Sequence, residues 1–140
     1  MTHLAIEDVA EYSATSAKIH QHWFEVTGGW ATDERAETEP QAQQRFAVAT
    51  HRHAWHAELW ERRRPAIPVD VAPVSVPAGA TLGRDTPVEH RLEAYCAALD
   101  VVLAADAALR SRCDERLDPS TLRVIELVTA DLVRLRQRDG

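Results

Sequence analysis

Apolar residues recur every three to four positions along four stretches of the chain, which is the spacing of an amphipathic helix. These stretches cover approximately residues 4–27, 38–64, 87–113 and 119–138. The strict alternation that is typical of a strand occurs only at residues 69–76, inside a connection rich in proline. The pattern therefore predicts an all-α protein.

Residues that begin and end helices support these boundaries. Asp118 precedes Pro119, and Thr86 precedes Pro87, so each pair offers a capping side chain followed by a proline at the first helical position. Two consecutive glycines, at residues 28–29, are expected to end the first helix, because glycine favours the residue just beyond a helix end.

The lengths of the connections predict the topology. Short links join the first helix to the second and the third to the fourth, so each pair is expected to run antiparallel. A helix of 26 residues is about 39 Å long. The connection over residues 65–85 is rich in proline and can extend by about 3.1 Å per residue, enough to cross the molecule. We expect a four-helix bundle with a long crossover between its second and third helices, forming one domain over residues 1–140.

Composition narrows the class of protein. The chain has 140 residues, of which 45% are hydrophobic and 27% charged, and these values are typical of a globular protein. We expect it to be cytoplasmic, without a membrane partner, because it has neither a long apolar run nor a signal peptide. The net charge is −6 and arginines stand beside acids, which argues against a nucleic-acid partner. Cys96 and Cys113 lack the paired spacing of a metal or redox motif.

Turning each residue by 100° around its helix places four ionisable side chains on the buried faces: His20, His53, Asp106 and Asp131. His51 points outward. His20 precedes the turn between its helix and the next by about as many residues as His53 follows it, so the two imidazoles should be level. Asp106 is expected at a similar height, whereas Asp131 is expected about two turns away.

The second helix also resembles a known superfamily. Its residues 49–55 read Ala-Thr-His-Arg-His-Ala-Trp and are similar to the Glu-x-x-His segment of ferritin-like proteins, with Thr50 in the glutamate position and His53 in the histidine position. His20 and Asp106 lie near positions where that superfamily often has glutamates. The resemblance implies a small ferritin-like bundle whose metal site has degenerated.

His20, His53 and Asp106 are the candidate catalytic residues, and three hypotheses remain open for them. They could bind a single iron, manganese or zinc ion, as two histidines and a carboxylate do in mononuclear sites. They could form a closed network of hydrogen bonds without any chemistry. They could also transfer protons to a small organic molecule inside the bundle. The candidate ligand-binding residues around them are Thr50, His56, Tyr95 and Asp131.

A second apolar stripe on the predicted second helix, formed by Val48, Trp55 and Leu59, requires a cover. The valines of residues 69–76 and a homodimer partner are the two alternatives. The leading hypothesis is a protein that binds, and could convert by acid–base chemistry, a small organic ligand. The absence of any cofactor is favoured over the presence of a single iron, manganese or zinc ion. A mononuclear metal oxidoreductase and a non-catalytic dimerising or partner-binding module are its rivals.

Overall fold

The computed structural model describes residues 4–33, 39–68 and 86–137. Within these ranges the chain forms four α-helices and no strand. The helices are α1 (Ile6–Ala31), α2 (Pro40–Arg63), α3 (Val88–Arg112) and α4 (Pro119–Arg136). The predicted all-α class and the four helices are confirmed.

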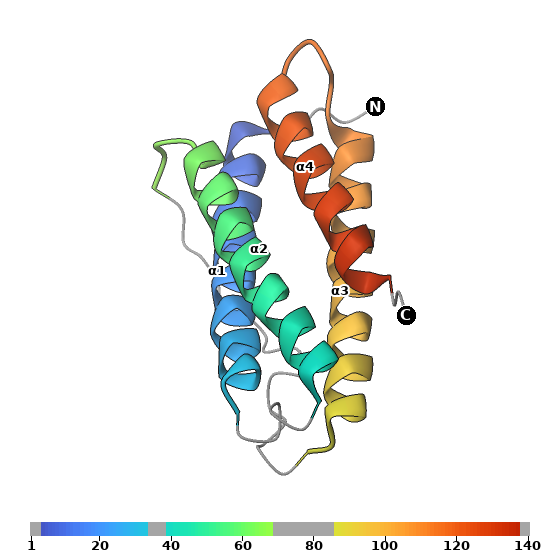
Figure 1. Ribbon diagram of the computed structural model, residues 1–140. Helices are drawn as coiled ribbons and strands as arrows, with labels where there is room; N and C mark the ends of the chain where they lie inside the picture. Colours follow the sequence, from blue (N-terminus) through green and yellow to red (C-terminus); the bar gives the residue numbers. More distant parts are fainter. Residues whose placement is uncertain (1–3, 34–38, 69–85, 138–140) are drawn as a thin grey trace.

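The four helices form two antiparallel pairs (Figure 1). α1 packs against α2, α3 packs against α4, and α4 also contacts α2. α2 and α3 point in the same direction, as the sequence predicts for two hairpins in series (Figure 1). The expected crossover and the strand-like residues 69–76 fall within residues 69–85, which lie outside the described ranges.

Two helix ends differ from the sequence-based prediction. α1 continues through Gly28 and Gly29 to Ala31, and Trp30 is buried against Trp23 and Phe46, with ring centroids 6.2 and 5.1 Å apart. Two glycines in a helix cost about 2 kcal/mol relative to alanine. Burying an indole of roughly 200 Å² contributes about 5 kcal/mol, so tertiary packing outweighs the glycines.

At the start of α3, the predicted cap by Thr86 is also wrong. Pro87 has extended backbone angles and occupies the N-cap position itself, without a side-chain cap. The prediction at the start of α4 is confirmed, because the Asp118 carboxylate accepts a hydrogen bond from the Thr121 backbone N–H at 3.1 Å. Capping of this kind stabilises a helix by about 1 kcal/mol.

The core has small side chains between α1 and α2 and larger side chains toward α3 and α4. Alanines let α1 and α2 approach closely, and those that are buried are Ala10, Ala14, Ala17, Ala42, Ala49 and Ala57. Larger side chains fill the space toward the second hairpin, where the rings of Trp23 and Tyr95 lie 5.3 Å apart. The tight α1–α2 contact brings side chains of these two helices together in the middle of the bundle.

The second stripe on α2 is partly open to solvent. Val48 is 45% exposed and Trp55 is 40% exposed, whereas Leu59 packs against the core. The valines that the sequence offers as a cover lie outside the described residues. A homodimer partner therefore remains a prediction.

Candidate functional site

Three histidines meet in the middle of the bundle, one from α1 and two from α2. Nδ1 of His20 lies 3.0 Å from Nδ1 of His53, and the ring centroid of His56 lies 5.0 Å from that of His20. One ring nitrogen from each residue fits within a separation of 4.8 Å. All three side chains are buried, with exposures of 1%, 1% and 0%. We call His20, His53 and His56 the imidazole cluster.

Helix geometry explains this arrangement. Residues three apart lie on one face of a helix, so α2 presents His53 and His56 side by side. The antiparallel α1 brings His20 opposite them. The prediction that the imidazoles of His20 and His53 are level is confirmed by the contact between their rings.

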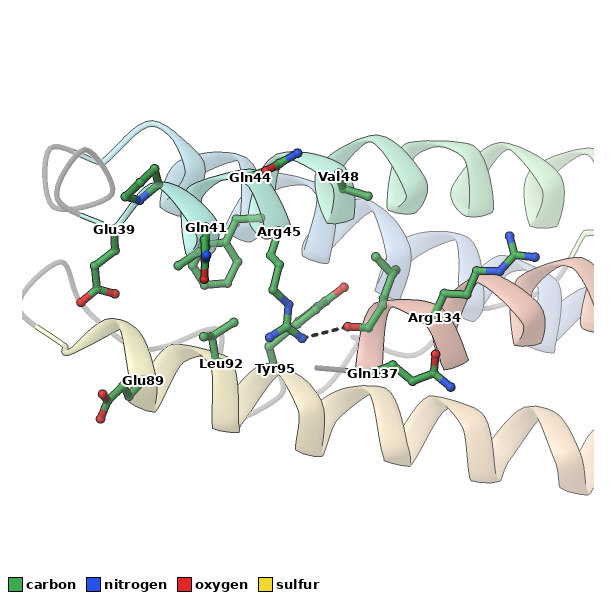
Figure 2. A pocket seen from close by; sticks show the side chains of 14 residues that line it. Glu39, Gln41, Gln44, Arg45, Val48, Glu89, Leu92, Tyr95, Arg134 and Gln137 are labelled. Carbon is green, nitrogen blue, oxygen red and sulfur yellow. Dashed lines mark hydrogen bonds between the residues drawn. The ribbon is translucent and has the colours of Figure 1, made fainter. Parts of the chain in front are cut away.

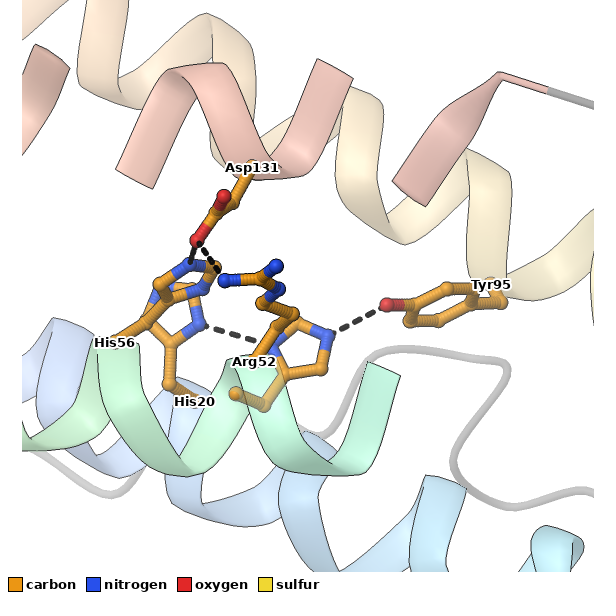
Figure 3. Close-up of polar contacts among 6 residues, drawn as sticks. His20, Arg52, His56, Tyr95 and Asp131 are labelled. Carbon is orange, nitrogen blue, oxygen red and sulfur yellow. Dashed lines mark hydrogen bonds and ion pairs between the residues drawn. The ribbon is translucent and has the colours of Figure 1, made fainter. Parts of the chain in front are cut away.

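Two of the three imidazoles are held from outside the cluster by fixed partners (Figure 3). Nε2 of His53 lies 2.6 Å from the phenol oxygen of Tyr95 on α3, and Nε2 of His56 lies 2.9 Å from Oδ2 of Asp131 on α4. Asp131 also faces the guanidinium of Arg52 at 3.8 Å. These contacts fix both rings and leave their Nδ1 atoms turned inward.

The imidazoles are neutral at physiological pH. Burial lowers the pKa of His53 to about 3 and that of His20 well below its usual range. Burial also lowers the pKa of His56, although Asp131 acts in the opposite direction. A neutral imidazole has one N–H and one nitrogen with a free lone pair, and this second nitrogen can bind a metal ion.

The hydrogen atoms of the cluster can be assigned from its partners. A carboxylate only accepts hydrogen bonds, so His56 donates its Nε2–H to Asp131 and keeps a lone pair on Nδ1. Within the described part of the chain, this Nδ1 atom and Nε2 of His20 are buried without a hydrogen-bond partner. Native proteins usually pair such nitrogens with a side chain, water or ion, and the described residues also leave Nε1 of Trp23 and of Trp60 unpaired.

The structure separates Asp106 from the imidazole cluster. Its carboxylate accepts a hydrogen bond from the Tyr12 phenol, and Tyr12 precedes His20 by two helical turns, or about 12 Å along α1. Asp106 is buried as predicted, with 1% exposure, but its partner is this phenol. We call Tyr12 and Asp106 the phenol–carboxylate pair.

The other predicted site residues have mixed outcomes. The expectation that Asp131 lies two turns from the histidines is wrong, because it contacts His56 directly. Tyr95 and His56 do belong to the site. Thr50 instead lies against Thr27, with their hydroxyl oxygens 2.9 Å apart, and helps to join α1 to α2.

The sequence did not predict that His56 is a member of the imidazole cluster, or that Tyr12 is the partner of Asp106. His56 was expected beside the histidine layer, whereas the structure places it within the cluster. The available signal was the His-x-x-His spacing of residues 53 and 56, which puts two imidazoles on one helix face. Tyr12 had no such signal, because its role depends on α3 lying opposite.

Comparison of the chain with protein-family models, with curated proteins and with solved structures finds no match. None of the described helices has the length and apolar character that crossing a membrane requires.

Proposed function

We propose that this protein is a mononuclear metal protein of ferritin-like architecture that binds one divalent transition-metal ion through His20, His53 and His56. The observation that carries the proposal is the Nδ1 atom of His56. This buried nitrogen carries a lone pair and has no hydrogen-bond partner among the described residues. Two further imidazoles lie beside it.

The spacing of the nitrogens supports a metal site. Two nitrogens bound to tetrahedral zinc at about 2.05 Å lie about 3.3 Å from each other. Nδ1 of His20 and Nδ1 of His53 form a hydrogen bond of 3.0 Å, and this separation is close to the value for two zinc ligands. A small outward movement of either ring would accommodate the ion.

The outer contacts support the same conclusion. Metal-binding histidines usually donate the N–H of their second ring nitrogen to a carboxylate, a backbone carbonyl or a water molecule, which fixes the ring and its tautomer. Asp131 and Tyr95 stand in these places for His56 and His53. An ion bound at the three Nδ1 atoms would pair Nδ1 of His56, which the hydrogen bonds of the cluster leave without a partner, whereas Nε2 of His20 stays unpaired in either case.

The ligand set indicates which ions and which chemistry to expect. Imidazole suits zinc, copper, nickel and iron(II), whereas magnesium and calcium prefer oxygen ligands. Three protein ligands leave a position open, and an ion with an open position acts on a bound water or substrate as a Lewis acid. The small-molecule hypothesis, which uses Asp106 beside the histidines, has less support because Asp106 pairs with Tyr12.

Metal titration of the chelator-treated protein tests the proposal. We expect one zinc or cobalt ion per chain, and a cobalt spectrum with tetrahedral intensity. Replacing His53 or His56 by alanine should weaken binding by at least about 100-fold, because each removes one of three ligands. His51→Ala is the matched control, since this histidine is on the same helix and exposed.

The proposal is wrong if the wild-type protein binds neither ion, or if His51→Ala weakens binding as much as His53→Ala. Circular dichroism of each variant shows whether lost binding reflects lost folding. If both alanine variants unfold, His56→Gln supplies a test with a polar side chain of similar size.

A further inference from the structure

A wide groove opens where the first half of α2, the first half of α3 and the last turn of α4 meet (Figure 2). Its volume is about 1200 Å³, larger than the 460 and 380 Å³ of two other hollows in the described part of the chain. Small-molecule sites usually have volumes of about 300–1,000 Å³. The groove is therefore large enough for an organic ligand.

The groove has an apolar floor and one cation at its centre. Ala42, Phe46, Leu92 and Leu135 contribute apolar surface. The side chain of Arg45 extends from α2 into the middle of the groove (Figure 2). Sites that bind amphipathic ligands combine these two features, apolar walls and a few placed polar groups.

The guanidinium of Arg45 has N–H donors that no described residue accepts. Its Nη2 donates to the carbonyl oxygen of Leu135 at 3.0 Å, which caps the end of α4. This is its one hydrogen bond to the described residues, and a guanidinium carries five N–H donors. The remaining donors can bind a planar carboxylate at two points.

Charges at the outer end of the groove favour the same orientation. Glu39 and Glu89 lie together at the end away from Arg45 (Figure 2). They repel an anionic group from that end, so an acid with an apolar body would place its carboxylate at Arg45. A phosphate, with its greater charge, favours a site in which several cations converge, whereas Arg134, the second arginine of the lining, points away from Arg45 (Figure 2).

The groove also shares a wall with the imidazole cluster. Tyr95 lines the groove, and its phenol oxygen lies 2.6 Å from Nε2 of His53. A ligand beside Arg45 would therefore be separated from the cluster by the side chain of Tyr95. Neither of the two smaller hollows is lined by a residue that contacts the cluster.

We propose that this groove binds a small organic carboxylate, with its carboxylate on Arg45 and its apolar body on Phe46 and Leu92. Such a molecule would be the substrate or effector of the metal centre, and this last step rests on the proposed function.

Matched acids and amides test the groove. Phenylacetate and hexanoate, with phenylacetamide and hexanamide as neutral partners, are titrated into isotope-labelled protein in the presence of a chelator. We expect the acids to shift the amide resonances around Arg45 and Leu92, and to bind at least about tenfold more tightly than the amides. Because no metal is present, the result does not depend on the metal proposal.

Two variants identify the cation. Arg45→Gln should reduce the affinity for each acid to that of its amide, while Arg134→Gln should leave it within about twofold, because Arg134 points away from Arg45 (Figure 2). Equal affinity for acids and amides, no saturation by any acid, or an equal loss in both variants would overturn the proposal. If Arg45→Gln does not fold, the comparison of acids with amides in the wild-type protein still decides.

Repeating the titration after loading with zinc separates the two proposals. If the acids bind in chelator but zinc does not bind, the groove stands and the metal centre fails. If zinc binds and the acids do not, the metal centre stands and the groove proposal fails.

Discussion

The phenol–carboxylate pair and the imidazole cluster are two of the places where the bundle buries polar groups, and they differ in how these groups are paired. In the phenol–carboxylate pair, Tyr12 donates to Oδ1 of Asp106, while Oδ2 of Asp106 has no hydrogen-bond partner among the described residues. In the imidazole cluster, two ring nitrogens remain without a partner among the described residues. The described side chains therefore pair one carboxylate oxygen at the first place, and at the second place they leave Nε2 of His20 and Nδ1 of His56 without a partner.

The two places also respond to burial in opposite directions. Burial raises the pKa of Asp106 to about 6, although the hydrogen bond from Tyr12 lowers it. Burial lowers the pKa of His53 to about 3. Both changes favour the neutral form, but an acid becomes neutral by keeping its proton and an imidazole by losing one.

The largest expected effect is the acid sensitivity of the metal-free protein. Histidines of the unfolded chain take up protons below a pH of about 6.5, while the buried imidazoles stay neutral, so the free energy of unfolding falls as the pH falls. Each imidazole contributes up to about 1.4 kcal/mol per pH unit. Urea unfolding at pH 7, 6 and 5 with a chelator measures this, and stability independent of pH would contradict it.

Asp106 supplies the matched control, because its contribution has the opposite sign. Its pKa is raised in the folded state, so between about pH 6 and 4 the folded protein binds more of this proton and gains stability as the pH falls. Asp106→Asn removes this gain. Its stability should therefore fall more steeply than that of the wild type over the same interval.

The second prediction compares the two acids in metal binding. Asp131→Asn removes the charge that accepts a hydrogen bond from His56, and should weaken zinc binding about 10- to 100-fold. Asp106→Asn changes an acid of the same kind that contacts no histidine, and should leave the affinity within about twofold. Competition with a zinc indicator at pH 7.5 measures both, and equal losses would indicate that the two places are not independent.

The sequence predicts the inward faces well because helix periodicity is a local property. His20, His53 and Asp106 are each buried as predicted, and His51 is exposed. The relative height of His20 and His53 could be counted across the short connection between α1 and α2. Both predictions need only the helix periodicity and the length of a short connection. Neither requires knowledge of contacts between residues far apart in the sequence.

Heights across the two hairpins could not be predicted in the same way. Asp106 and Asp131 follow a connection of about twenty residues, and its length does not fix how far α3 and α4 slide along the bundle. Counting residues therefore predicted Asp106 beside the histidines and Asp131 two turns away from them. In the structure, Asp131 contacts His56 and Asp106 contacts Tyr12. The burial of His56 depends on the same register, because α4 covers that side of α2.

The smallest effect is expected from separating the phenol–carboxylate pair. Tyr12→Phe removes the hydrogen bond that lowers the pKa of Asp106, so the buried carboxyl group takes up a proton more readily, and the loss in unfolding free energy at pH 7 should be only about 1 kcal/mol. Asp106→Leu preserves the shape of the side chain and leaves the phenol unpaired, at a similar cost. The double variant Tyr12→Phe/Asp106→Leu leaves no polar group unpaired there, so it should lose less than the sum of the single variants in urea unfolding. Strictly additive losses would show that the two side chains are not energetically coupled, and the contrast with the imidazole cluster would fail.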